Sequence, residues 1–133
     1  MVKILYTILT VTVATFAGFE SHIEEITLQI KQRMVDGGSW RNGCPVPLKD
    51  LRYLRIKHIN FNGEEKMGEM IVHKEVSVEV TKIFEALYKI GYPIKKMRLV
   101  SDYQGSDWQS IESDNTSAFN CRAATGSKKW SKH

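Results

Sequence analysis

The stretch LRIKHINFNGEEKMGEMIVH, residues 54–73, decides the fold because it contains two β-strand patterns around a strong turn. Apolar and polar residues alternate from Leu54 onward, as expected for a strand with one buried face. Asn62 and Gly63 form a dipeptide that is typical of tight hairpin turns. The return run, residues 66–73, carries the apolar triplet Met-Ile-Val. The sequence therefore predicts an antiparallel β-hairpin with a solvated tip.

An amphipathic helix is predicted directly after the hairpin, and we expect it to be the central helix of the core. Its apolar residues recur at helical spacing: Val76, Val80, Ile83, Phe84, Leu87 and Ile90. Gly91 ends this pattern and Pro93 prevents its continuation. The next residues, 94–101, have the pattern of a strand that returns beside the hairpin, with Met97 and Leu99 on one side. Residues 102–117 are polar and predict a long irregular loop.

A shorter helix is predicted before the hairpin, over residues 22–35. Ser21 and Glu24 have the spacing of a capping box. Four apolar residues then follow at helical intervals: Ile23, Ile26, Ile30 and Met34. The run Asp36-Gly37-Gly38 ends the helix. Two prolines and a glycine in residues 39–48 exclude a regular helix there, which indicates an ordered crossing loop.

Length and composition describe one ordinary globular domain. The chain has 133 residues, of which 42% are hydrophobic and 26% charged, enough for a single core. Its formal charge of +4 is mild, and its lysines and arginines are scattered. A folded nucleic-acid binder concentrates its basic residues on one face, so nucleic acid is not an expected partner.

The amino-terminal residues 1–17 have the layout of a secretory signal peptide. A short positive start precedes an apolar run from Ile4 to Phe16, and Ala17 offers a small residue for cleavage. A buried strand or an uncleaved anchor is the alternative for this run. The run is too short for a comfortable membrane span, so no stable span is expected after cleavage.

Cys44 and Cys121 suit such an exported protein. In an oxidising compartment a disulfide between them would close a long loop, worth roughly 4 kcal/mol in the chain-entropy description. Two buried free thiols are the alternative.

Two blocks of sequence resemble one protein family. The first is NTSAFNCR, residues 115–122, with WSKH at residues 130–133, and the second is SWRNGCPVPL, residues 39–48. Both are similar to the zinc D-alanyl-D-alanine carboxypeptidases and endopeptidases of bacterial cell walls. The resemblance runs from about Met34 to His133. The family's zinc motif has the pattern His-x-x-Gly-x-Ala-x-Asp, of which this sequence contains only the opening histidine, His133.

The resemblance implies an α+β fold in which a small antiparallel sheet packs with helices, as in the Hedgehog and D-alanyl-D-alanine peptidase fold. Residues 18–133 would form the N-terminal portion of such a domain, which is then C-terminally incomplete. It also implies a zinc peptidase, a monomer when complete, that hydrolyses peptide bonds of peptidoglycan stem peptides. Zinc would polarise the scissile carbonyl and activate water. The enzyme would work in the bacterial cell envelope, in the periplasm or outside the cell.

The same resemblance assigns the site residues. His133 matches the first zinc ligand, and Arg122 matches the arginine that binds the substrate carboxylate or the oxyanion. Ser117 and Ser131 would shape the site and contact substrate through hydrogen bonds. Because Cys44 and Cys121 both lie in the matching stretches, a bridge between them is favoured.

The remaining parts of the family's metal site are an aspartate, a second histidine and a general-base acid, and none of them has a counterpart in this sequence. Catalytic zinc needs three protein ligands. We therefore expect this chain by itself to bind zinc weakly, to hydrolyse nothing and, because its sheet would have an open edge, to be only marginally stable.

These assignments have alternatives. Arg122 could instead hold a loop through an ion pair with Asp114. The chain could also be a metal-free relative that recognises cell-wall peptides through Arg122. The other three histidines, His22, His58 and His73, are expected to be structural or solvated and not to bind metal.

Overall fold

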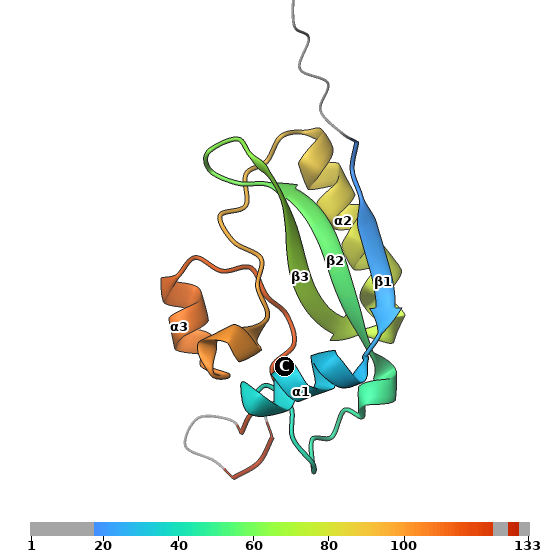
Figure 1. Ribbon diagram of the computed structural model, residues 1–133, viewed down its shortest axis with the longest axis vertical. Coiled ribbons are helices and arrows are strands. Elements are labelled where there is room, and N and C mark those ends of the chain that lie inside the picture. The colour runs from blue at the N-terminus through green and yellow to red at the C-terminus, as the bar shows by residue number, and fades with distance from the viewer. Residues whose placement is uncertain (1–17, 124–127, 131–133) are drawn as a thin grey trace, which may run out of the picture.

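The computed structural model describes residues 18–123 and 128–130 of the chain. Its centre is a three-stranded antiparallel sheet with the order β1-β2-β3, shown in Figure 1. The strands are β1 (Ser21–Glu25), β2 (Leu51–Ile59) and β3 (Glu65–His73). The α-helices are α1 (Leu28–Asp36), α2 (Ser77–Lys89) and α3 (Asp107–Glu112). The expected α+β class, a small antiparallel sheet packed with helices, is confirmed at this level.

The β2–β3 hairpin forms where the sequence predicts it. The two strands pair over their whole length, from Leu51 opposite His73 to Ile59 opposite Glu65. In the turn, Gly63 has a φ of 76°, a left-handed conformation that glycine adopts without steric cost. The Asn-Gly signal therefore identified the turn correctly.

The helix predicted over residues 22–35 is wrong over residues 22–27. Ser21 and Glu24 belong to β1, which pairs antiparallel with β2, so they do not form a capping box. The helix begins only after Thr27, whose side-chain oxygen accepts a hydrogen bond from the backbone N–H of Ile30 at 3.2 Å. Pairing with the long neighbouring strand β2 provides hydrogen-bond partners for backbone N–H and C=O groups of residues 21–25, and this outweighs their weak helical periodicity.

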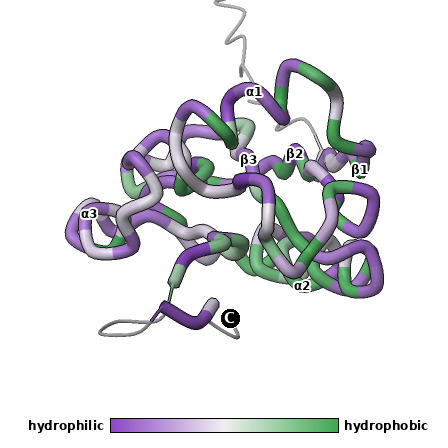
Figure 2. The backbone as a smooth tube through the Cα atoms, turned by 90° about the horizontal axis from the view of Figure 1, so that it is seen from below, coloured by the Kyte–Doolittle hydropathy of each residue, from purple (hydrophilic) through white to green (hydrophobic). Residues whose placement is uncertain are grey.

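The sheet lies between α1 and α2, as Figure 2 shows from below. The face toward α1 is built on Ile30, Met34, Leu51, Tyr53, Ile71 and Leu99. The face toward α2 is built on Leu54, Ile56, Met70, Val72, Ile94 and Met97, against which Val80, Phe84 and Leu87 of α2 pack. Alternate residues of a strand point to opposite faces, and this explains why neighbouring residues of β2 and β3 belong to different clusters. The helix predicted after the hairpin forms as α2, but three apolar residues of its predicted pattern, Val76, Ile83 and Ile90, are exposed at 42%, 54% and 75%.

The strand predicted over residues 94–101 is not formed. This segment instead runs along the outer edge of β3, where the Glu69 N–H donates to the Met97 carbonyl at 3.0 Å. Met97 and Leu99 are both buried, but they belong to the two different apolar clusters and not to one side. Gly68 allows this approach, because a Cβ at that position would lie 2.5 Å from the Cβ of Met97.

The polar residues 102–117, expected to be irregular, contain the short helix α3. Ser106 caps it by accepting a hydrogen bond from the Gln109 N–H at 3.2 Å. Serine is a typical residue at the start of a helix, but the segment has too few apolar residues to show a helical period. This helix provides one wall of the site described below.

Candidate functional site

Residues 118–122 form the extended segment on which the candidate site is built. The Phe119 N–H donates to the Ile71 carbonyl of β3 at 3.1 Å, and the Cys121 N–H donates to the Ser39 carbonyl at 2.8 Å. The structure joins Cys121 to Cys44 in a disulfide with a Cα–Cα distance of 6.2 Å. The segment is extended but makes no regular ladder with β3.

Side chains alternate between two sides of this segment. Phe119 and Cys121 line an apolar groove, whereas Asn120 and Arg122 bond to the beginning of α3. This period of two is the usual consequence of extended backbone. As a result Arg122 faces a polar site next to α3 and does not line the apolar groove.

Arg122 forms an ion pair with Asp107, the first residue of α3. Its Nε donates to Asp107 Oδ2, and its Nη1 donates to the Ala123 carbonyl at 3.2 Å. About a third of each paired side chain remains exposed, 36% for Arg122 and 35% for Asp107. The alternative partner proposed from the sequence, Asp114, is wrong, because Asp114 pairs with Lys95 at 2.9 Å.

The Asp107 carboxylate is also held from its other side. The Asn120 amide nitrogen donates to Asp107 Oδ1 at 2.7 Å and to the Gly105 carbonyl at 2.9 Å. Both of these neighbours are acceptors, so the orientation of the Asn120 amide is fixed. Asn120 is 6% exposed, and its Oδ1 has no hydrogen-bond donor among the described residues.

Ser117 contacts the same helix one turn later. Its hydroxyl lies 3.4 Å from that of Ser110, which also receives a hydrogen bond from the Asn115 amide at 3.0 Å. α3 thus contacts both Arg122 and Ser117, through residues that are three positions apart. Two of the sequence-predicted residues are therefore brought to one helix, although they bind to different turns of it.

Ser131 and His133 lie outside the described residues, as do residues 1–17, which the sequence predicts to be a signal peptide. Within residues 18–123 and 128–130, no three His, Cys, Asp or Glu side chains gather into a group that could hold a metal ion. The described residues therefore do not by themselves provide a zinc site.

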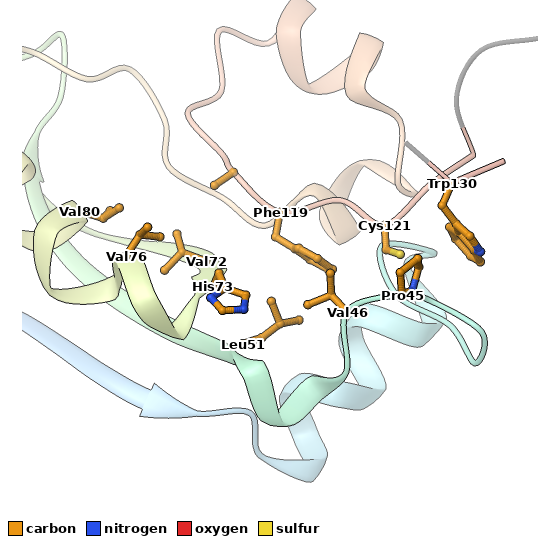
Figure 3. Close-up of a pocket in the computed structure, with 11 residues that line it drawn as sticks. Pro45, Val46, Leu51, Val72, His73, Val76, Val80, Phe119, Cys121 and Trp130 are labelled. Atoms are coloured by element: carbon orange, nitrogen blue, oxygen red, sulfur yellow. The ribbon is translucent and has the colours of Figure 1, made fainter. Parts of the chain in front are cut away.

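The apolar groove has a volume of about 640 Å³ and runs across one end of the sheet. In Figure 3, Val72, Val76 and Val80 line one end, and Pro45 and Trp130 line the other. The Arg41 guanidinium lies 4.9 Å from the Trp130 ring centre, within the range of a cation–π contact.

His73 adds a polar group to this groove. Its Nδ1 accepts a hydrogen bond from the Glu75 N–H at 3.2 Å, which assigns the proton of the neutral ring to Nε2.

A second polar cluster, for which no motif in the sequence is a sign, crosses the face of the sheet toward α1. Arg33 of α1 donates two hydrogen bonds to the Glu69 carboxylate, at 2.7 and 2.9 Å, and the Tyr53 hydroxyl donates a third at 2.5 Å. The Arg33 hydrogen bonds hold the pKa of Glu69 below its usual value. Burial, followed by the bond to Glu69, raises the pKa of Tyr53 to about 12.

His58 is buried at 5% exposure, with its Nδ1 3.4 Å from the Ile56 carbonyl. Burial lowers its pKa, because a charged imidazole is poorly solvated there. His22 is partly exposed beside Glu20, at 2.8 Å. Each of the three described histidines thus has a local structural contact.

Neither a protein-family model, nor a curated protein, nor a solved structure matches this chain. Among residues 18–123 and 128–130, no helix has both the length and the apolar character that crossing a membrane would require.

Proposed function

We propose that this chain belongs to the zinc peptidases of bacterial cell walls and that Arg122 binds the carboxylate of a peptidoglycan stem peptide. The main support for the proposal is that the Arg122 guanidinium is only partly hydrogen-bonded and remains partly exposed. Two of its five N–H groups are used, by Asp107 and the Ala123 carbonyl, and its side chain remains 36% exposed. The N–H groups left on Nη1 and Nη2 are suited to a two-pronged grip on a carboxylate.

The finer fold is part of the same proposal. We infer a Hedgehog and D-alanyl-D-alanine peptidase type of domain over residues 18–133, and the antiparallel sheet with helices on both faces is compatible with it. The bond between Cys44 and Cys121 supports export to an oxidising compartment, such as the periplasm or the exterior.

Zinc is the proposed cofactor, with His133 as one ligand by resemblance. When bound, the metal would supply the Lewis acid for hydrolysis of the stem peptide. The described residues would bind and orient the peptide. Arg122, held by Asp107, would bind its free carboxylate end, and Ser117 is held against α3 by its contact with Ser110.

A pair of ligands that differ in one group tests the role of Arg122. The stem pentapeptide L-Ala-γ-D-Glu-L-Lys-D-Ala-D-Ala and its C-terminal amide are titrated into the chain by calorimetry. Charge-assisted hydrogen bonds contribute about 1.5–3 kcal/mol, so the acid should bind at least about tenfold more tightly than the amide. The preference should disappear in Arg122→Gln. Equal affinity of both peptides for the unaltered chain would overturn the proposal.

Repeating the titration with zinc, and analysing the mixture for released D-alanine by mass spectrometry, separates two forms of the proposal. Zinc-dependent release supports the peptidase. Binding of the acid that is indifferent to zinc, with no release, supports the metal-free cell-wall-peptide-binding relative instead.

A further inference from the structure

We propose that Asp107 is the positioning residue that orients Arg122 toward its carboxylate ligand; this rests on the carboxylate-binding role proposed above for Arg122. An arginine side chain has four rotatable bonds, and ordering it on binding costs free energy. An arginine that is already held in the free protein avoids most of this cost. The contacts of Asp107 match such a holding role.

The Asp107 carboxylate cannot rotate freely, because each of its oxygens has a separate donor. Oδ1 accepts from the Asn120 amide at 2.7 Å, and Oδ2 accepts from Arg122 Nε. Arginine–carboxylate pairs are frequently two-pronged, with two N–H groups of the arginine donating to the two carboxylate oxygens. Here the second oxygen is occupied by Asn120, so Asp107 takes only Nε and leaves the outer end of the guanidinium available.

Asn120, which holds Asp107, is itself bonded to closely packed backbone. Asn120 also donates to the Gly105 carbonyl at 2.9 Å. Gly105 has a φ of 68°, and a Cβ there would lie 2.8 Å from the Gly38 carbonyl oxygen, so the two glycine backbones are in close contact. Gly38 follows Gly37, the residue that caps the C-terminal end of α1. The position of Asp107 is thereby tied to α1 and not only to its own short helix.

This arrangement fixes the direction of the guanidinium. Nε is held by Asp107, and Nη1 is held on one side by the Ala123 carbonyl at 3.2 Å. Among the described residues, Nη2 has no acceptor, and one N–H of Nη1 remains as well. Donors on these two neighbouring nitrogens can meet both oxygens of a carboxylate. The negative charge of Asp107 is directed at Nε, away from the outer end where the ligand would bind.

The test measures the acid-to-amide preference for the stem pentapeptide in three variants by calorimetry. Asp107→Asn keeps the size of the side chain and removes its charge, and we expect the preference to fall about tenfold. Asp107→Glu restores the charge at a slightly displaced position and should recover part of the preference. Asp114→Asn is the matched control, because Asp114 is an exposed carboxylate near the other end of α3 that pairs with Lys95. This control should keep the full preference.

A second readout is independent of ligand binding. Hydrogen exchange of the Arg122 Nε–H, followed by NMR in nitrogen-labelled protein, should be slow in the unaltered chain and several-fold faster in Asp107→Asn. A thermal melt of each variant checks that the fold persists.

The outcomes separate this inference from the function on which it rests. If the unaltered chain prefers the acid, Arg122→Gln abolishes the preference and Asp107→Asn retains it, the positioning role is overturned and the binding role of Arg122 stands. If the unaltered chain has no preference for the acid, both are overturned. If Asp107→Asn loses the preference and Asp114→Asn keeps it, the positioning role is supported.

Discussion

Removal of the disulfide should destabilise the protein strongly. Cys44 and Cys121 are 77 positions apart, so the bridge closes a long loop. In the chain-entropy description, cross-linking a loop of this length stabilises the fold by about 4.5 kcal/mol, because the unfolded chain loses conformational freedom. For a domain near this size, each kcal/mol corresponds to roughly 4 °C in Tm. The variant Cys44→Ser/Cys121→Ser should therefore melt about 15–20 °C lower than the oxidised protein.

Circular dichroism melts and urea titrations of the double variant and the oxidised protein provide the assay. Reduction of the unaltered protein serves as the control: it should lower Tm to the value of the double variant, while reductant should leave the double variant unchanged. The backbone hydrogen bonds of Phe119 and Cys121 persist without the bridge, so the folded form should remain populated at low temperature. A difference below about 1 kcal/mol would show that loop closure by this bridge does not stabilise the fold.

Three further predictions concern the two faces of the sheet. Burial lowers the pKa of His58 from 6.5, so the unfolded chain takes up the proton first and the free energy of unfolding should fall as pH drops below about 6.5. In thermal melts from pH 7.5 to 5, the fall in Tm should be smaller in His58→Gln, and parallel curves would contradict this. The hydrogen bonds from Arg33 lower the pKa of Glu69, so its contribution to stability is present above pH 4.5 and is lost on further acidification. Glu69→Gln should lower the free energy of unfolding by about 1–2 kcal/mol in urea titrations at pH 7, and an unchanged midpoint would contradict this. Gly68→Ala should lower the free energy of unfolding by about 1–3 kcal/mol, since the new Cβ would lie 2.5 Å from the Met97 Cβ. A urea midpoint equal to that of the unaltered protein would show that Met97 can move away without loss of stability.

Local patterns predicted the hairpin and the helix after it, because both depend on strong periodic burial and a specific turn. The errors lie where partners distant in sequence decide the structure. Residues 21–25 form a strand because β2 offers an edge for pairing, and residues 94–99 remain irregular while they contact β3 at single points such as Glu69. Neither partner can be recognised from the periodicity of the segment itself.

The sequence singled out Arg122 and Ser117, but neither Asp107 nor Asn120, which hold Arg122 in place. Arg122 could be singled out from the resemblance, whereas its partner could not, since Asp107 and Asp114 both lie in the same polar stretch. The choice depends on α3, which brings Asp107 to Arg122 and directs Asp114 to Lys95. The Arg33–Glu69 pair, whose members are 36 positions apart, had no signal in the sequence.

The most direct test of the carboxylate-binding role follows the Arg122 side chain itself. In nitrogen-labelled protein, the Nε–H resonance of Arg122 is assigned through Arg122→Lys and followed by NMR during titration with the stem pentapeptide. If Arg122 binds the carboxylate, this resonance should shift saturably with the free acid and little or not at all with the C-terminal amide. An Arg122 resonance that stays in place with the acid, while resonances elsewhere in the protein move, would contradict it.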